Sequence, residues 1–545
     1  MDYAYLAELL FPDVKTTPED MEKRYPPRNL PEDAKVTRFA PSPTGFVHFG
    51  GLFPTRVGER LAHQSGGVFF LRIEDTDMKR KVEGAEENLI SILDKYNIRF
   101  DEGVGKGGDY GPYRQSERCE IYHTYAKYLV QNGMAYPCFC TEEELCAIRA
   151  EQEALGADPG YYGKWAKYRD ADISVIEEKI KAGEPYVLRF RSNGNVENKI
   201  KFTDLVRGDI EITENDKDHV LLKSDGIPVY HFAHVVDDHL MRTTHVVRGE
   251  EWLPSLPFHL QLFRALGFKM PKFLHISQIM KLENGSKKKL SKRDNGASLA
   301  DYEAEGYPEI SVIEYIMILL NSNYEEWRMQ NPDKNYEEFP FSLKKMSSSG
   351  CLLDIDKLND VSKNTVSRMD TDTVYEQYTA WAQKFDNDFY KIFSANAEYS
   401  KRILSIGRGT QKPRKDITTW RDVKPYVSLF FDELFEMQAT FEEKFDKRDI
   451  KKILTEFSNG YDENDAMDVW FGKMKDIAAQ NGFAAETKAY KQNPDDYKGS
   501  IGDVSMFVRI AVTGKTNSPD LYEVMHIIGK ERTLSRINSV ISSLK

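Results

Sequence analysis

The alternation of apolar and polar positions near the start of the chain follows the order of an α/β sheet. It predicts strands over residues 35–40 and 67–73 and helices over residues 51–64 and 83–96. In a parallel sheet, ligands bind at the carboxyl ends of the strands. The loops 41–50 and 74–77 follow the two predicted strands, so we expect a ligand site where these loops meet.

The next part of the chain interrupts this pattern. The strand-rich segment 186–222 is interpreted as an insertion, after which the α/β pattern resumes at 229–234 and 245–248. The first 34 residues differ from both parts, because they are rich in proline and lack a sustained period. They are interpreted as an appendix to the fold.

The second half of the chain is predicted to be helical. Beyond about residue 300 the pattern indicates amphipathic helices over 310–320 and 427–445, with a polar loop over 329–341. A chain of 545 residues is too long for one core. Because domains usually hold about 100–200 residues, we expect about three to five of them.

The composition is typical of a soluble cytoplasmic protein. It is 40% hydrophobic and 30% charged, and its most apolar stretches are far shorter than the roughly 20 residues of a membrane span. The first residues have neither the basic segment nor the apolar core of a signal peptide. Five sparse cysteines, an odd number, favour a reduced cytosol over a disulfide framework.

The net charge of −12 argues against nucleic acid as a partner, but the charge is unevenly distributed. Residues 272–293 and 401–421 each contain seven basic residues and one acidic residue. A solvated face explains either window alone. Two such windows over a hundred residues apart indicate an extended polyanion as a partner.

The loop after the first predicted strand has the features of a phosphate site. Pro41 and Pro43 stiffen it, and its glycines allow a ligand to approach the backbone closely. The helix that follows offers free N–H groups and the positive end of its dipole. His48 precedes this helix and could donate to a phosphate oxygen. The alternative interpretation is a tight turn with a buried histidine.

A second candidate is the lysine loop, residues 284–293, which reads N-G-S-K-K-K-L-S-K-R. Glycine and serine before a run of lysines predict a mobile loop that closes over an anion. A mobile ammonium of this loop could then clamp a leaving pyrophosphate most strongly in the transition state. The alternative is a solvated basic loop.

A third candidate is the segment from His231 to His239, which reads H-F-A-H-V-V-D-D-H. Histidine and aspartate at short intervals are metal-ligand types, yet the spacing matches no standard ligand set. The segment could equally be a strand whose alternate residues face a pocket. A metal-dependent nucleotide hydrolase therefore stays a minor alternative.

The order of the motifs resembles that of the glutamyl-tRNA synthetases, class I enzymes of the bacterial type. The motifs are P-S-P-T-G-F-V-H-F-G-G from Pro41, R-I-E-D-T-D from Arg72, G-P-Y-R-Q-S-E-R from Gly111, L-L-K-S-D-G-I-P-V-Y-H-F-A-H-V-V-D-D-H from Leu221, V-V-R-G-E-E-W-L from Val246 and K-L-S-K-R from Lys289. The segments 48–51 and 289–293 match the family's two signature motifs. The resemblance is dense to residue 310 and thin beyond it.

The resemblance implies the roles of individual residues. Those that would bind glutamate are Arg38, Ala40, Ser42, Glu74, Tyr230, His234 and Arg248. Those that would contact ATP are His48, Gly50, Trp252, Lys289 and Lys292, and of these His48, Lys289 and Lys292 would be catalytic. Glu74 would hold the substrate ammonium, and Arg248 would pair with the side-chain carboxylate through two hydrogen bonds. In the helical half, Arg414 lies near the position of an arginine that reads the anticodon in discriminating members.

This chain departs from the family at positions that bear on ligands. His234 stands where members commonly carry an asparagine. Some members bind zinc through a Cys-x-Cys pair and a later Cys-x-His, but only Cys138 and Cys140 are kept here, and the later positions are Trp165 and Lys167. Two sulfurs do not complete a tetrahedral site, and Cys146 adds a third ligand at best. We therefore expect no structural zinc, and we expect Mg²⁺ to accompany ATP.

The family plan implies an α/β Rossmann-type class I catalytic domain with an inserted α+β acceptor-end domain, followed by an all-helical anticodon-binding half. The expected parts are an N-terminal extension 1–34, a first catalytic half 35–117, the acceptor-end insertion 118–232, a second catalytic half 233–280, a stem-contact region with the lysine loop 281–372, and two helical anticodon-binding domains 373–462 and 463–545.

The implied reaction is ATP-dependent activation of glutamate, followed by transfer to the 3′-terminal ribose of glutamate tRNA by a monomer. Whether glutamine tRNA is also charged stays open, although Arg414 favours glutamate tRNA alone. One rival is a glutaminyl-specific enzyme, against which Arg248 and the helical half both argue. Another is a non-catalytic RNA-binding protein, against which the complete set of ATP motifs argues.

Overall fold

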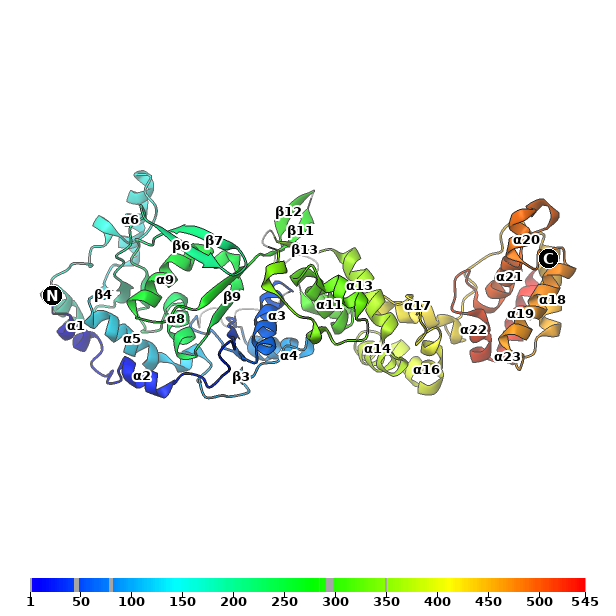
Figure 1. The fold of residues 1–545 in the computed structure, drawn as a ribbon, viewed down its shortest axis with the longest axis horizontal. Helices are drawn as coiled ribbons and strands as arrows, with labels where there is room; N and C mark the ends of the chain where they lie inside the picture. Colours follow the sequence, from blue (N-terminus) through cyan, green and yellow to red (C-terminus); the bar gives the residue numbers. More distant parts are fainter. Residues whose placement is uncertain are drawn as a thin grey trace. The chain divides into compact units, whose positions relative to one another are not determined.

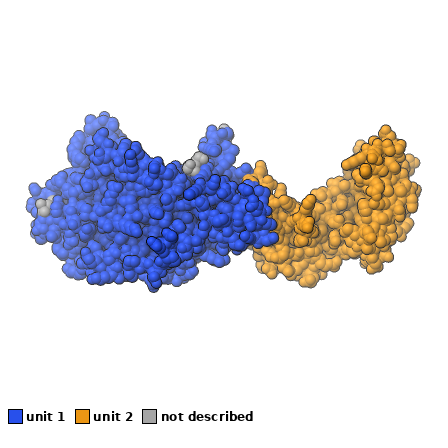
Figure 2. Space-filling view, in the orientation of Figure 1, with its two compact units in different colours: residues 1–301, 313–354 blue, residues 302–312, 355–545 orange. Residues whose placement is uncertain are grey.

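The computed structural model describes residues 2–43, 49–77, 82–283, 285–290, 298–347 and 350–544 (Figure 1). They divide into two compact units, shown in Figure 2: unit 1 comprises residues 1–301 and 313–354, and unit 2 comprises residues 302–312 and 355–545. No helix within the described ranges has both the length and the apolar composition needed to cross a bilayer.

The centre of unit 1 is built from parallel strands, as the sequence predicts. Strands β1 (Val36–Phe39), β2 (Val68–Leu71) and β3 (Glu102–Gly103) pair in that order, and β9 (His245–Gly249) pairs with β10 (Lys272–Ile276). The amide of Thr244 donates to the carbonyl of Val36 at 2.9 Å, which joins the two groups of strands. Helix α3 (Phe49–Gln64) contacts β1, β2 and β9, and α4 (Ala85–Lys95) precedes β3.

The interrupting segment is confirmed as strand-rich. It contributes β5 (Val187–Phe190), β6 (Lys199–Asp204), β7 (Gly208–Thr213) and β8 (Val220–Leu222). Strand β5 pairs with β8 and with β4 (Ala135–Cys138), whereas β6 and β7 form a hairpin. The helices of this region are α5 (Cys119–Gln131), α6 (Glu142–Ala154) and α7 (Ile173–Lys181).

The interpretation of residues 231–239 as a strand is wrong, because they belong to helix α8 (Tyr230–Leu240). This helix packs on α5 and on α9 (Leu256–Ala265), and nearly all of its residues are buried. Its polar residues Asp237 and Asp238 are therefore inside the protein, paired with arginines. Buried polar positions remove the one-sided apolar stripe by which a helix is detected in a sequence.

The N-terminal residues are part of the core of unit 1, so their interpretation as an appendix is wrong. Helices α1 (Tyr3–Leu10) and α2 (Pro18–Arg24) pack against α5, and Leu6, Ala7 and Tyr25 are at most 1% exposed. Short helices with prolines between them leave no long period in the sequence. Unit 1 also includes the hairpin of β11 (Ile279–Glu283) and β12 (Ser286–Lys289), with β13 (Cys351–Leu352) beside β11.

The described residues of unit 2 form helices joined by turns, which confirms the predicted helical half. Helices α10 (Leu299–Glu305) and α11 (Glu309–Leu320) contain the division between the units, and α12 (Tyr324–Gln330) belongs to unit 1. The helices that follow are α13 (Ile355–Arg368), α14 (Thr371–Phe385), α15 (Asn387–Ser394), α16 (Ala397–Ser405), α17 (Val423–Val427), α18 (Lys447–Gly460), α19 (Met467–Gln480), α20 (Thr487–Gln492), α21 (Ile501–Thr513), α22 (Leu521–Ile528) and α23 (Lys530–Ser543).

The helix predicted over 427–445 is wrong, because α17 ends at Val427 and turns follow it. Side chains from α23 donate hydrogen bonds to backbone carbonyl groups of this segment. These bonds stand in place of the backbone hydrogen bonds of a helix. Arg536 donates to the carbonyl of Leu429 at 2.8 Å, and Arg532 donates to that of Phe430 at 3.0 Å. The apolar residues of this segment anchor it in the core, and an anchored turn and a helix bury the same residue types.

Candidate active site

A cavity of about 520 Å³ opens at the carboxyl ends of the parallel strands. Its lining includes residues that follow β1, β2, β9 and β10, the first residues of α3 and α8, and the end of β12. The sequence-based expectation of a ligand site at these strand ends is therefore matched by an actual cavity.

The cavity brings together most of the residues singled out in the sequence. Those that line it are Arg38, Ala40, Gly50, Glu74, Tyr230, Arg248, Trp252 and Lys289. Ser42 is exposed and His234 is fully buried, and neither is part of the lining. His48 and Lys292 lie outside the described residues. Arg414 belongs to unit 2.

One side of the cavity is built on a buried network of arginines and carboxylates. Arg38 pairs with both carboxylate oxygens of Asp238, at 3.0 and 3.2 Å. Arg72 lies between two acids and donates to Asp238 at 2.9 Å and to Glu74 at 3.0 Å. Each side chain of this network is at most 8% exposed. Paired arginines and acids of this kind fix one another's geometry strongly.

The cavity-facing acid of this network is Glu74. Burial raises the pKa of its carboxyl group to about 7, and the nearby Arg72 and Arg38 oppose this rise. A cation in the cavity would act in the same direction as the two arginines and favour the ionised form of Glu74, because an opposite charge lowers the pKa of a carboxyl group. Glu74 is thus suited to receive a cationic group of a ligand.

The network continues into α8 through Asp237, whose role no sequence argument identified. Its carboxylate accepts hydrogen bonds from Arg118 at 2.7 Å, from Gln115 at 2.9 Å and from the Tyr122 hydroxyl at 2.9 Å. The motifs quoted from the sequence did contain the residues of this part of the network, which are Arg72, Gln115, Arg118 and Asp237. Only the fold shows that these distant motifs meet.

Arg248 of β9 also lines the cavity, and its side chain is 6% exposed. Its Nε donates to His275 Nε2 at 2.9 Å, and its Nη1 donates to His259 Nδ1 at 3.1 Å. Burial lowers the pKa of both imidazoles, so both are neutral and can accept these bonds. Asp204 holds the remaining nitrogen of His275, with 2.7 Å between its carboxylate and Nδ1.

Arg248 therefore keeps its positive charge uncompensated. Within the described ranges it forms no ion pair, and its buried Nη2 has no hydrogen-bond partner. An unpaired buried charge is costly unless a partner arrives. The arrangement favours a ligand with an anionic group at this end of the cavity.

His234 supports the cavity from outside its lining. Its ring stacks on Tyr230 with 5.4 Å between the ring centroids, and its Nδ1 lies 2.8 Å from Asp238. Burial lowers its pKa to about 4. His231 Nδ1 lies 2.8 Å from His259 Nε2, so these side chains are engaged with protein groups. The described residues contain no cluster of three or more potential metal ligands, so nothing there supports the metal-hydrolase alternative.

Lys289 reaches the cavity from the end of the β11–β12 hairpin. It pairs in register with Met280, and it is exposed, as are Lys287 and Lys288. Of these three, only Lys289 lines the cavity, while Lys288 pairs with Glu283 at 2.6 Å. Among the described lysines of the hairpin, Lys289 thus brings its ammonium group to the cavity.

Arg414 lines a separate hollow of about 260 Å³ within unit 2. Its Nε and Nη2 donate to the two carboxylate oxygens of Asp416, at 2.6 and 2.9 Å. Lys515 and Tyr426 line the same hollow. Asp416 and Asp422 line it too, so the hollow carries both positive and negative side chains.

Comparison with known families agrees with this architecture. Residues 35–360 match the catalytic domain of the class I tRNA synthetases for E and Q, and residues 373–541 match an anticodon binding domain. The chain is 50% identical over 546 residues to a glutamate–tRNA ligase of Acetivibrio thermocellus, covering 99% of this chain and 100% of that protein. It is 45% identical to one from Sorangium cellulosum, covering 97% and 99% respectively.

A solved structure shares the fold over nearly the whole chain. The glutamate tRNA ligase from Elizabethkingia meningosepticum, crystallised in complex with its amino acid, has a TM-score of 0.74 and 29% identity. The match covers 94% of this chain and 100% of that one. These similarities extend through both units.

Proposed function

This chain belongs to the glutamate–tRNA ligase family of class I tRNA synthetases, and from this premise we propose how its cavity performs the reaction. An oxygen of the glutamate α-carboxylate attacks the α-phosphorus of ATP, which forms glutamyl-adenylate and releases pyrophosphate. The terminal ribose hydroxyl of tRNA then takes the glutamyl group. Neither step uses a protein nucleophile, so catalysis consists of positioning and charge stabilisation.

Glutamate binds in the cavity, between Glu74 and Arg248. Glu74 receives the substrate ammonium, and Arg248 pairs with the side-chain carboxylate. The observation that carries this proposal is that the buried, unpaired guanidinium of Arg248 and the buried carboxyl group of Glu74 line the same cavity. Arg38, Ala40 and Tyr230 complete the glutamate site, and for Ser42 and His234 the support is the family motif alone.

ATP occupies the end of the cavity nearer α3 and the hairpin. Gly50 and Trp252 contact the nucleotide, and Lys289 interacts with the triphosphate. His48 and Lys292 act on the phosphates with it, a proposal that rests on the motifs. Mg²⁺ accompanies ATP and offsets the charge of its phosphates.

We propose that the chain holds no structural zinc. Cys138 and Cys140 are the only candidates from the family's ligand set, and Cys140 Sγ lies 3.5 Å from the Tyr161 hydroxyl. Lys167, at a later ligand position, pairs with Glu144 at 2.7 Å. A zinc-selective chelator, with Mg²⁺ in excess, is expected to leave activity and the melting temperature unchanged. One tightly held zinc per purified chain, measured by elemental analysis, would contradict this.

The proposed assignment of the remaining parts follows the family plan. Residues 118–232 receive the acceptor end of the tRNA, residues 281–372 contact its stem, and residues 373–462 and 463–545 bind the anticodon. The chain acts as a cytoplasmic monomer. Aminoacylation of purified glutamate and glutamine tRNAs with labelled glutamate tests the substrate assignment directly.

We further propose that Arg414 restricts the enzyme to glutamate tRNA. The planar guanidinium can pair with one base edge and be blocked by another, and RNA loops expose such edges. Its pair with Asp416 engages Nε and Nη2, while Nη1 takes no part in that pair. Arg414→Gln is expected to admit glutamine tRNA while changing the charging of glutamate tRNA little, as measured by the same aminoacylation assay.

The neighbouring Lys415→Gln serves as the matched control and is expected to leave tRNA choice unchanged. If Arg414 only meets phosphate, Arg414→Gln instead weakens both tRNAs alike and flattens the salt dependence of binding. That result would remove Arg414 from anticodon reading.

A further inference from the structure

Residues 2–34, here called the N-terminal strap, lie outside the matched catalytic domain, which begins at residue 35. They are nevertheless folded into unit 1. Met21 and Tyr25 are at most 2% exposed, and α1 packs along α5. Lys127 of α5 donates to the carbonyl of Val14 at 2.9 Å and pairs with Glu8 at 2.7 Å. The strap is thus tied down along its length.

The second half of the strap holds the C-terminal end of α8. Glu22 pairs with Arg242 at 2.7 Å, and Arg242 Nε donates to the carbonyl of Tyr25 at 3.1 Å. Arg28 Nε donates to the carbonyl of Met241 at 3.1 Å. Helix α8 begins at Tyr230, which lines the cavity, and carries Asp237 and Asp238 near its end.

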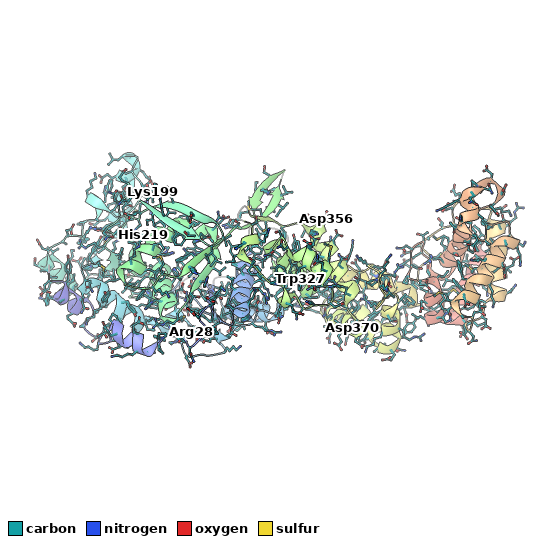
Figure 3. The ribbon with its side chains drawn as sticks, viewed as in Figure 1. Arg28, Lys199, His219, Trp327, Asp356 and Asp370 are labelled. Carbon is teal, nitrogen blue, oxygen red and sulfur yellow. The ribbon has the colours of Figure 1, made fainter. Side chains whose placement is uncertain are left out.

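The same part of the strap also contacts β3 and the segment that follows it, up to residue 113. Arg28 forms a bidentate pair with Glu102 at 2.6 and 2.9 Å, and their side chains are 7% and 17% exposed. The Arg28 guanidinium lies 3.7 Å from the ring centroid of Tyr110. In the view of Figure 3, Arg28 is found between the positions that α2 and β3 occupy in Figure 1. One arginine therefore joins α8 to this segment.

Both contacts are linked to the glutamate end of the cavity through intervening residues. Glu102 also accepts from the Tyr113 hydroxyl at 2.7 Å, and the carbonyl of Tyr113 accepts from the amide of Ile73 at 2.9 Å. Ile73 is the residue before Glu74. On the other side, the Arg118 guanidinium lies over the Tyr25 ring at 5.5 Å and pairs with Asp237.

We propose that Arg28 is a positioning residue for glutamate: by clamping Glu102 to the end of α8, the strap sets the geometry of Glu74 and of the Asp238 network. Bidentate arginine–carboxylate pairs give geometric specificity as well as energy, and a small misplacement of a binding group costs a large factor in rate. This inference rests on the proposed placement of glutamate at Glu74. None of the contacts described above involves Gly50, Trp252 or Lys289, the described residues that are proposed to contact ATP.

The test compares full-length variants in ATP–pyrophosphate exchange with tRNA present. Arg28→Met removes the pair while keeping a long side chain over Tyr110. It is expected to raise the KM for glutamate about tenfold or more and to leave the KM for ATP within about twofold. Arg28→Lys keeps the charge without the bidentate fork and should fall between Arg28→Met and the wild type. Arg24→Met is the matched control. It removes an exposed pair between Arg24, which lies on the same strap, and Glu120 of α5.

If Arg28 only stabilises the fold, Arg28→Met lowers the melting temperature and changes the KM values for glutamate and ATP together. That result overturns the proposal. Glutamate kinetics unchanged in Arg28→Met overturn it as well. If Arg28→Met does not fold, the ratio of the two KM values in Arg28→Lys decides. Glu102→Gln should repeat the effect, and combining it with Arg28→Met should add little, because both remove one interaction. A wild-type chain that does not activate glutamate would instead contradict the proposed function.

Discussion

Arg248→Gln is expected to lower kcat/KM for glutamate by between about 10²- and 10⁴-fold. Removing one partner of a buried charge pair costs about 3–5 kcal/mol, and each 1.36 kcal/mol is about a factor of ten. The bound carboxylate would lose a cationic partner that neither neighbouring imidazole could replace, because His259 and His275 are neutral. The measurement is ATP–pyrophosphate exchange at varied glutamate concentration, with tRNA and ATP saturating.

The matched control for this variant is Arg264→Gln. Arg264 is an exposed arginine on α9, the helix that also carries His259. It is expected to leave kcat/KM for glutamate within about twofold. If Arg248→Gln changes the constant no more than this control does, Arg248 does not read the substrate side chain, and the orientation proposed for glutamate is wrong.

Lys289→Ala is expected to lower the turnover of adenylate formation by about 10²- to 10³-fold while the KM for glutamate changes little. An ammonium that contacts the leaving pyrophosphate acts mainly as charge develops, so its loss lowers kcat rather than ground-state binding. Lys289 lines the cavity from the end of the hairpin. Lys292, which lies outside the described residues, is expected to behave alike from its place in the motif.

Single-turnover formation of glutamyl-adenylate measures this effect without the contribution of product release. Lys287→Ala is the control, since Lys287 lies on the same strand, two residues away, and is absent from the cavity lining. Equal losses in the two variants would indicate a general effect of positive charge on the hairpin. A higher KM for glutamate at constant kcat would place Lys289 in ordinary substrate binding.

The elements that were predicted well from the sequence are those whose residues share the same kind of surroundings. Strands β1 and β2 are short, mostly buried runs bounded by turns, and the predicted helix over 310–320 matches α11 to within a residue. The errors arise where ion pairs and hydrogen bonds of polar side chains stabilise a segment, because the sequence then lacks the usual apolar period. Helix α8 buries Asp237 and Asp238 against arginines, and the turns after α17 are held by Arg532 and Arg536.

The candidate site shows the same division. The residues that line the cavity could be identified because they stand in contiguous motifs, as Glu74 and Arg248 do. The residues that set their properties could not. Asp204, His259 and His275 come from separate elements, and nothing in their local sequence indicates that they meet around Arg248. Their role depends on tertiary packing, which a single sequence does not encode in any local period.

The neutral imidazoles around Arg248 also limit how the amino-acid preference of this enzyme can be redesigned. A pocket for an uncharged side chain would need Arg248 replaced, but His275 Nε2 and His259 Nδ1 would then lose the donor that each accepts from. Leaving two buried acceptors unsatisfied is costly in itself. Asp204 prevents His275 from simply exchanging its tautomer, because its carboxylate needs the proton on Nδ1. A change of substrate therefore has to supply new donors for these two imidazoles as well as remove the charge of Arg248.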